Sequence, residues 1–388
     1  MRFGIYLNPQ TPGPEDDGRL IREVLGQVDL AADLGFSSVW LTEHHFTGYN
    51  AFSDPLLLAT AITQRRPLEL GFSIAVAPFH HPIRFVTQCN LLDQLSGGRL
   101  IVGVGPGNSP VEFAGFGQDV DRRHAMLAEF IRIAEQAWTA PPEGFRYEGE
   151  FWSGEVRGRI IPAPVQRPHP PIAWGTTTPA TVERIGGEGR VWLIAGSWDP
   201  DKLQQYYRLY LKGMDEAGIG DVQREALWSK TAYVLKVYLA GPDEDWRETL
   251  DPYIDIFVRK NLQANFAVDT ITREQFEQNK QFFYRGFFAG RPADLVEKLR
   301  PYAQLGVGTV MLWMNFGHLP DELVRQTIVR FAAEVAPELR AVPRQPGLFD
   351  LLRGTEAKPL PVWVRGKDGY AWQDPPAQPP KADWAGTV

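Results

Sequence analysis

Three segments near the start of the chain decide the fold: FGIYL (3–7), LIREVLGQVDLAADL (20–34) and SVWLT (38–42). The first and third are short runs rich in apolar and β-forming residues, which is typical of buried strands. The middle segment repeats apolar residues at helical spacing, for example Val24 and Val28, and a glycine follows its end. Together the three segments predict a strand, a helix and a second strand.

The same alternation continues along the chain. Further strands are predicted at 70–77, 100–105, 172–175, 191–195, 231–239 and 309–314, and helices at 55–63, 85–95, 126–138, 181–185, 203–217, 293–305 and 322–335. Strands that are apolar throughout belong in a parallel sheet covered by helices, and eight such repeats are the number that closes a barrel. We therefore expect an α/β fold, a (β/α)8 TIM barrel. An open doubly wound sheet is the alternative, because the pattern counts strands and not closure.

The composition excludes several classes of protein. With 388 residues, 44% hydrophobic and 22% charged, the chain is not mainly disordered. Its net charge of −7 provides no overall attraction for nucleic acid or an anionic membrane, and no segment has the roughly twenty apolar residues of a membrane span. Cys89 is the only cysteine, so no internal disulfide can form. Because Asn8 and Pro9 interrupt the N-terminal apolar run before a signal-peptide core develops, we expect a cytoplasmic protein.

The domain organisation follows from a change in composition. Residues 341–388 hold eight prolines and three tryptophans and show little helical periodicity. We expect a barrel over 1–340 and a Pro- and Trp-rich extension over 341–388, whose tryptophans favour an arm docked on a neighbouring surface. The long stretches 106–171 and 240–308 are expected to be insertions between strands.

Histidines follow two of the predicted strands. VWLTEHHF (39–46) runs directly into Glu43, His44 and His45, and a second pair, His80 and His81, follows the third predicted strand. The C-terminal strand ends form the active-site face of a barrel, so these imidazoles are candidates for acid–base work there. The spacing lacks the helical pattern of a zinc-binding histidine pair, and we expect no metal. Histidines hydrogen-bonded within the core are the structural alternative.

Small-residue loops follow two other predicted strands. In GVGPGNSP (103–110), a glycine-rich turn after a strand allows backbone amides to approach a phosphate. In GTTTP (175–179), both hydroxyls and backbone amides lie just before a predicted helix, where an anion can bind. The first does not match the dinucleotide-binding pattern, because Pro106 removes an amide donor. A plain structural turn is the alternative there. Two such loops together suggest one phosphate-bearing ligand.

Several segments of the sequence resemble those of a known family. The segments VWLTEHHF (39–46), HPIR (81–84), NLLDQLSGGRLIVGVGPG (90–107) and PHPPIAWGTTTP (168–179) look like those of the bacterial luciferase-like flavin monooxygenases. The similarity keeps order and spacing from about residue 1 to residue 340. The proline-rich extension is outside it.

The resemblance implies a barrel that binds FMN at its C-terminal end, in a homodimer or higher oligomer. Reduced FMN from a separate flavin reductase reacts in that family with molecular oxygen, through a flavin hydroperoxide, and oxygenates a small hydrophobic aldehyde, ketone or similar substrate. By position His44 matches the catalytic histidine, and Ser73–Ile74 the segment under the flavin ring, which often has a non-proline cis peptide. The cofactor-binding positions implied are Glu43, His45, Ser73, Ile74, Asn90, Gly105, Gly107, Asn108, Gly175, Thr176, Thr177 and Trp198.

Some positions depart from bacterial luciferase itself. Gly105, Pro106 and Gly175 stand where luciferase has a reactive cysteine, an arginine and a phosphate-binding glutamate, which argues against light emission and leaves Arg122 or Arg123 as a candidate phosphate cation. A narrow apolar cavity is needed to keep water from the reaction, and its candidate lining residues, which are otherwise core residues, are Phe46, Phe79, Trp174, Trp192 and Trp198. Two alternatives stay open: a deazaflavin-dependent dehydrogenase or reductase on the same barrel, and a non-catalytic flavin-binding accessory subunit.

Overall fold

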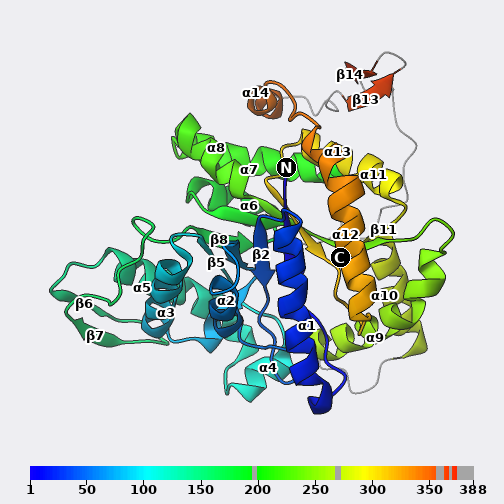
Figure 1. The fold of residues 1–388 in the computed structure, drawn as a ribbon. Coiled ribbons are helices and arrows are strands. Elements are labelled where there is room, and N and C mark those ends of the chain that lie inside the picture. Colours follow the sequence, from blue (N-terminus) through cyan, green and yellow to red (C-terminus); the bar gives the residue numbers. More distant parts are fainter. Residues whose placement is uncertain (195–198, 267–271, 355–361, 367–368, 374–388) are drawn as a thin grey trace.

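The computed structural model describes residues 1–194, 199–266, 272–354, 362–366 and 369–373, in which strands and helices alternate (Figure 1). The strands are β1 (Arg2–Leu7), β2 (Ser38–Leu41), β3 (Glu69–Phe72), β4 (Ala75–Val76), β5 (Leu100–Gly105), β6 (Gly144–Tyr147), β7 (Gly154–Arg157), β8 (Ile172–Gly175), β9 (Val191–Ile194), β10 (Ala232–Leu239), β11 (Phe287–Gly290), β12 (Thr309–Trp313), β13 (Val362–Gly366) and β14 (Gly369–Gln373).

The α-helices are α1 (Pro14–Asp33), α2 (Pro55–Thr63), α3 (Pro82–Ser96), α4 (Pro110–Gly115), α5 (Arg123–Thr139), α6 (Pro179–Gly187), α7 (Pro200–Glu216), α8 (Asp221–Lys230), α9 (Trp246–Phe266), α10 (Arg273–Arg285), α11 (Pro292–Gln304), α12 (Asp321–Arg330), α13 (Ala336–Arg340) and α14 (Leu348–Arg353). Short 3-10 turns lie at Ala77–Phe79 and Val120–Arg122, and one π-helical turn lies at Phe331–Val335.

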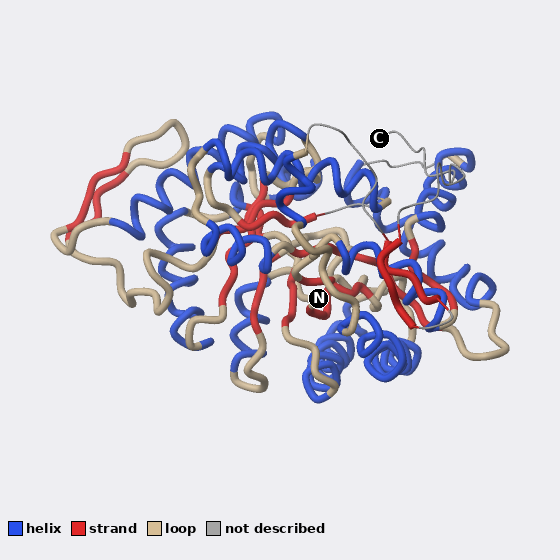
Figure 2. The backbone as a smooth tube through the Cα atoms, turned by 90° about the horizontal axis from the view of Figure 1, so that it is seen from above, coloured by secondary structure: helices blue, strands red, loops and turns tan. Residues whose placement is uncertain are grey.

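Eight parallel strands close into a barrel. Their order is β1, β2, β3, β5, β8, β9, β10 and β12, and β12 pairs back with β1. The pairing of β9 with β10, Leu193 with Ala232 and Ile194 with Tyr233, completes the ring and excludes an open sheet. Viewed from above, the strands lie centrally with helices around them (Figure 2). The predicted TIM barrel is confirmed.

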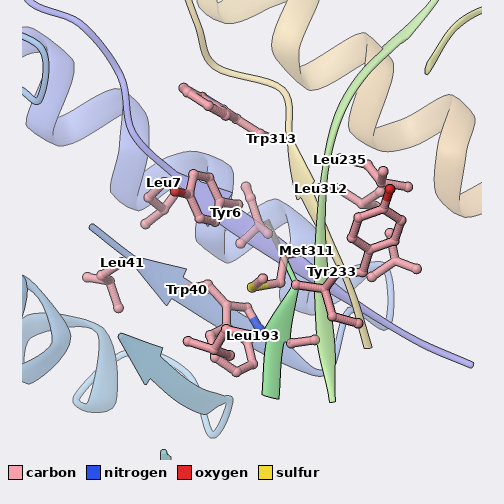
Figure 3. Packing of buried hydrophobic residues seen from close by; sticks show 14 of the residues in the cluster. Tyr6, Leu7, Trp40, Leu41, Leu193, Tyr233, Leu235, Met311, Leu312 and Trp313 are labelled. Carbon is pink, nitrogen blue, oxygen red and sulfur yellow. The ribbon is translucent and has the colours of Figure 1, made fainter. Parts of the chain in front are cut away.

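Large side chains fill the barrel interior because neighbouring positions are glycines. Trp40 of β2 is fully buried, and its register partner in β3 is Gly71. A Cβ at Gly71 would lie 2.2 Å from Trp40 Cε3, and one at Gly4 would lie 3.0 Å from Trp40 Cδ1. Figure 3 shows Trp40 close to Met311 among the strands. The interior is therefore a packed core, and ligands have access only at its ends.

Proline starts many of the helices. It occupies the first helical position of α1, α2, α3, α4, α6, α7 and α11. Proline is favoured there because the first amide of a helix has no intrahelical acceptor and the fixed φ suits the helix. Among the described residues no helix is long and apolar enough to cross a membrane.

The structure differs from the sequence-based prediction at three places. The predicted strand 70–77 is divided into β3 and β4 by the Ser73–Ile74 peptide, after which the chain forms a 3-10 turn. The stretch 106–171 contains the antiparallel hairpin β6–β7, which projects from the barrel in Figure 1. The stretch 240–308 contains α9, α10 and the additional strand β11, which pairs with the end of β10.

The chain just beyond the barrel is docked on it. In α14, Leu348 and Leu352 are buried, and Phe349 packs edge-on against Trp228 of α8 with ring centroids 5.0 Å apart. Arg353 forms an ion pair with Asp215 of α7 at 2.8 Å. Residues 341–354 therefore belong to the packed body. Of the three tail tryptophans, Trp384 lies outside the described residues.

Candidate active site

His44 pairs with a buried carboxylate at the C-terminal end of the barrel. Its Nδ1 lies 3.0 Å from Glu112 Oε1, and the same oxygen accepts the backbone N–H of His45, also at 3.0 Å. Glu112 is 1% exposed and sits in the first turn of α4, whose N-cap is Ser109. Because a carboxylate only accepts, Nδ1 carries a hydrogen, and in the neutral form of the imidazole Nε2 is then the atom with the free lone pair. The arrangement is that of a base held by an orienting acid.

Glu43 joins the ends of two strands. Its Oε1 lies 3.0 Å from His45 Nε2, its Oε2 lies 2.9 Å from His80 Nε2, and Oε2 accepts the Val76 amide at 2.7 Å. Burial acts to raise the pKa of Glu43, but the His80 charge and these hydrogen bonds outweigh it and lower the pKa to about 2. Burial acts to lower the pKa of His80, but the Glu43 charge and hydrogen bond outweigh burial, so the pKa of His80 is raised. Of the two predicted histidine pairs, His44, His45 and His80 thus belong to one network, whereas His81 is exposed and lies outside it.

Ser73 and Ile74 lie beside this network and are joined by a cis peptide, as the resemblance implies. The Ser73 carbonyl accepts the Tyr6 hydroxyl at 3.3 Å. The Ile74 side chain lies over Gly105, where a Cβ would be 2.3 Å from Ile74 Cδ1, and near Gly175, where a Cβ would be 3.6 Å from Ile74 Cγ2. A side chain at Gly105 would therefore have to displace the end of the Ile74 side chain, and three strand ends meet around Ile74.

The two small-residue loops have the geometry of turns that leave backbone groups accessible. Gly107 has φ +69°, and a Cβ there would lie 2.7 Å from Val76 Cγ1. Asn108 is exposed. Thr176 Oγ1 accepts the Thr178 amide at 3.2 Å, but Thr178 provides no side-chain cap to α6.

Thr177 is exposed, and its carbonyl accepts the Tyr206 hydroxyl at 3.0 Å. Thr177 directly precedes Thr178, the N-cap residue of α6. The uncapped first turn of this helix is a place where backbone amides can meet an anion.

Aromatic rings surround His45 at the same end of the barrel. The His45 ring lies 4.8 Å from Phe116, which stacks on Phe79 at 4.5 Å and contacts Phe46 at 5.3 Å. Phe46 is 64% exposed, a high value for so large an apolar side chain. The three phenylalanine rings form an apolar surface next to the histidine network.

Other predicted positions are not gathered here. Asn90 lies within α3, where its amide donates to the Pro162 carbonyl and accepts from Trp138 Nε1, both at 2.8 Å. Trp198 lies outside the described residues. Among the candidate cations, Arg122 pairs with Glu150.

Two of the tryptophans proposed to line a cavity face the outer helices instead. Trp192 is fully buried among three tyrosines of α7, with a ring centroid 5.4 Å from that of Tyr207. Trp174 lies beneath the Arg184 guanidinium of α6, 5.0 Å from the ring centroid. The expectation that they line a cavity inside the barrel is wrong, because side chains alternate between the two faces of a strand and these two take the outer face.

Sequence reasoning missed Glu112 and Tyr49. Ser109-Pro110-Val111-Glu112 has the spacing of a helix capping box, which offers a structural reason for the glutamate. In the structure Ser109 Oγ does accept the Glu112 amide, at 3.4 Å, but the Glu112 carboxylate turns to His44. Tyr49 lies with its ring centroid 4.8 Å from that of His44, and its hydroxyl accepts Asn261 Nδ2 at 2.7 Å.

Comparison with known proteins shows the family of the chain. The family model of the luciferase-like monooxygenases matches residues 1–309. The chain belongs to the luciferase-like monooxygenase family. Among curated relatives, the oxygenase component of the flavin-dependent trigonelline monooxygenase from Acinetobacter baylyi is 22% identical over 357 residues, covering 87% of this chain and 95% of that protein. The chain is therefore a flavin-dependent monooxygenase by family.

Solved structures show the same fold with different cofactors. The monooxygenase RslO1 from Streptomyces bottropensis is similar with a TM-score of 0.73 and 25% identity, covering 87% of this chain and 99% of that one. The oxygenating constituent of 3,6-diketocamphane monooxygenase from Pseudomonas putida, in complex with FMN, has a TM-score of 0.69 and 19% identity over 89% of this chain and all of that one. An F420-dependent secondary alcohol dehydrogenase has a TM-score of 0.68 and 15% identity over 87% and 99%.

Proposed function

We propose that this protein is the oxygenase of a two-component system, which takes reduced FMN from a separate flavin reductase and uses molecular oxygen to oxygenate a small hydrophobic substrate such as an aldehyde or ketone. The observation that carries the proposal is the pairing of His44 with Glu112 beside the Ser73–Ile74 segment at the C-terminal end of the barrel. The trigonelline enzyme, named as an oxygenase component, and the FMN complex of the diketocamphane enzyme support the cofactor and the partner.

The described residues fit a flavin mononucleotide. Gly105 lets the Ile74 side chain lie close against β5, so that Ile74 can form the surface under a flat ring, and the Gly175–Thr177 loop with the uncapped start of α6 suits a phosphate. When bound, reduced FMN supplies two electrons and the site at which oxygen is activated. In our proposal Gly107, Asn108 and Thr176 complete the binding loops.

In our proposal, side chains of the protein handle the proton, position the flavin contacts and exclude water. His44 Nε2 takes or holds a proton at the reacting oxygen, and Glu112 keeps the imidazole in the required tautomer and orientation. Among the described residues, the hydrogen bonds to the Glu43 carboxylate come from His45, His80 and a backbone amide, so in our proposal it positions His45 beside the flavin. The rings of Phe46, Phe79 and Phe116 exclude water and favour an apolar substrate.

The second candidate is a deazaflavin-dependent dehydrogenase, favoured by the similarity to the F420-dependent alcohol dehydrogenase. On that hypothesis the cofactor exchanges hydride with the substrate, needs no oxygen, and His44 removes or returns the hydroxyl proton. A non-catalytic accessory subunit would have no use for an imidazole held by a buried acid.

We also propose a homo-oligomer in the cytoplasm. Exposed leucines on two adjacent helices support self-association: Leu57 of α2 is 71% exposed, and Leu91 and Leu95, one turn apart on α3, are 51% and 41% exposed. Size-exclusion chromatography with light scattering on the wild type and on Leu91→Glu tests this, since the charge would dissociate a dimer formed through α3.

An anaerobic titration tests the function. The protein is titrated with reduced FMN and separately with reduced F420, and each complex is mixed rapidly with oxygenated buffer. Tight binding of reduced FMN, followed by reoxidation at a rate that differs from that of free reduced FMN, supports the monooxygenase. Preference for reduced F420 with no oxygen reaction assigns the second candidate instead.

A further inference from the structure

A lysine without a counter-ion lies among aromatic rings at the end of the barrel that carries the site. Lys236 belongs to β10 and is only partly exposed. Its Nζ lies 5.1, 5.2 and 5.8 Å from the ring centroids of Phe283, Trp313 and Phe257. Within the part of the chain that the structure describes, Nζ has no hydrogen-bond acceptor and no carboxylate partner. A cation enclosed by apolar rings is stabilised when an anion joins it.

The neighbouring tryptophan has an unused hydrogen-bond donor. Trp313 of β12 is the register partner of Lys236 and is only 7% exposed. Its indole Nε1 is buried and has no hydrogen-bond partner among the described residues. An indole N–H can only donate, and a buried donor left unpaired costs free energy. Two donors on adjacent strands, a charged one and a neutral one, thus lack an acceptor.

This pair lies across the barrel from the residues assigned to the flavin. The Trp313 ring contacts Tyr6 at 5.2 Å between centroids, and the Tyr6 hydroxyl donates to the Ser73 carbonyl. Figure 3 shows Tyr6 and Trp313 on their neighbouring strands.

A second path of ring contacts leads to the catalytic candidate. It runs from Phe257, which contacts both Lys236 and Trp313, to Tyr49 at 6.0 Å and from there to His44 at 4.8 Å. Chains of contacting rings therefore link Lys236 to His44 and to the Ser73–Ile74 segment.

We propose that Lys236 and the Trp313 indole N–H bind an anionic oxygen, a carboxylate or a phenolate, of the organic substrate. The apolar rings around Lys236 accommodate the remainder of such a substrate, and the charge-assisted hydrogen bond fixes its orientation. The inference rests on the proposed function and adds one feature to its substrate: beside an apolar body, the substrate carries a carboxylate or a phenolate.

The experiment compares an anion with a neutral molecule of the same shape. Benzoate and benzamide are titrated into the purified protein, and binding is followed by isothermal calorimetry and by tryptophan fluorescence. 4-Nitrophenolate is titrated in the same way to test binding of a phenolate. The variants are Lys236→Met, which keeps the length of the side chain, Lys236→Arg, which keeps the charge, and Trp313→Phe. Lys298→Met removes an exposed lysine of α11 and is the control.

We expect the wild type and Lys298→Met to prefer benzoate to benzamide by about 10- to 100-fold, the range of a charge-assisted hydrogen bond. Lys236→Met should abolish the preference without weakening benzamide, Lys236→Arg should keep part of it, and Trp313→Phe should reduce it several-fold. A wild type that does not discriminate, or a Lys236→Met variant that still does, overturns the inference.

Reduced-FMN titrations of the same variants separate this inference from the proposed function. Lys236→Met should bind reduced FMN as the wild type does. If it loses reduced FMN, Lys236 serves the flavin, and the substrate inference fails while the function stands. If the wild type itself does not bind reduced FMN, the proposed function fails whatever the benzoate result.

Discussion

Replacing Glu112 tests whether that residue acts through His44. In Glu112→Gln the amide oxygen can still accept from His44 Nδ1 and the His45 amide, both of which use Oε1, but the negative charge is lost. Hydrogen bonds to charged groups contribute about 1.5–3 kcal/mol and neutral ones about 0.5–1.5, so the change weakens the support of His44 by roughly 1–1.5 kcal/mol. We expect the His44-dependent rate to fall about five- to tenfold.

Glu112→Ala should have a larger effect. It leaves His44 Nδ1 and the His45 amide without an acceptor and frees the imidazole to change tautomer. Loss of a residue that orients a functional histidine typically costs about 10- to 100-fold in activity or affinity.

The assay is the oxygen reaction of the reduced-FMN complex. Reoxidation of bound FMN is followed by absorbance after rapid mixing with oxygen, and hydrogen peroxide is measured at the end of each turnover. His44→Ala should bind reduced FMN normally while its reoxidation kinetics change. Glu129→Gln is the matched control, because Glu129 also accepts several backbone amides, at 2.7–3.0 Å, but contacts no histidine.

The decisive comparison is the double variant. If Glu112 acts only through His44, Glu112→Gln has no further effect on the rate in the His44→Ala background. Additive effects of the two substitutions would refute the positioning role. So would a Glu112→Gln variant with wild-type kinetics.

Three further predictions concern the network, the flavin platform and the chain beyond the barrel. Glu43→Gln should lower the melting temperature at pH 5, and the loss should become smaller toward pH 2. Folding lowers the pKa of this carboxyl from 4.5 to about 2, so its charge stabilises the fold above the ordinary pKa by up to about 3 kcal/mol, and this contribution is lost as the pH falls. An equal loss at both pH values contradicts the assignment. Gly105→Ala should displace Ile74 and weaken reduced-FMN binding at least tenfold in the same titration, whereas an unchanged dissociation constant removes Gly105 from the flavin site. Truncation after Arg340 should lower the melting temperature by several degrees because it removes the buried leucines of α14, while truncation after that helix should not; equal melting temperatures would mean that the docked segment is dispensable.

The barrel could be predicted because its strands are apolar on both faces. Parallel strands covered by helices appear in the sequence as short continuous apolar runs, and eight such runs are the number that closes a barrel. The extra strand β11 was missed because Phe287–Gly290 lies among aromatic and charged residues that have no clear period. The division of the third strand was not visible either, since Ser73 and Ile74 lie within an uninterrupted apolar run.

Only part of the site could be predicted from the sequence. Glu43 and His45 are neighbours in the chain, so their contact is local, and the strand end before them indicated where they lie. Glu112 reaches His44 across 68 positions, and only the turn from β5 into α4 brings them together. Trp192 shows the opposite error: its residue type suggested a cavity, but the alternation of side chains along β9 turns it toward α7.

The most direct test of the account is the structure of the FMN complex. Crystals of the protein are soaked with FMN under reducing conditions, and the position of the flavin is read from difference density. We expect the ring against Ser73–Ile74, the phosphate at the Gly175–Thr177 loop, and His44 Nε2 facing the reacting edge of the ring. FMN bound elsewhere, or His44 turned away from the ring with Glu112 still attached, would contradict it.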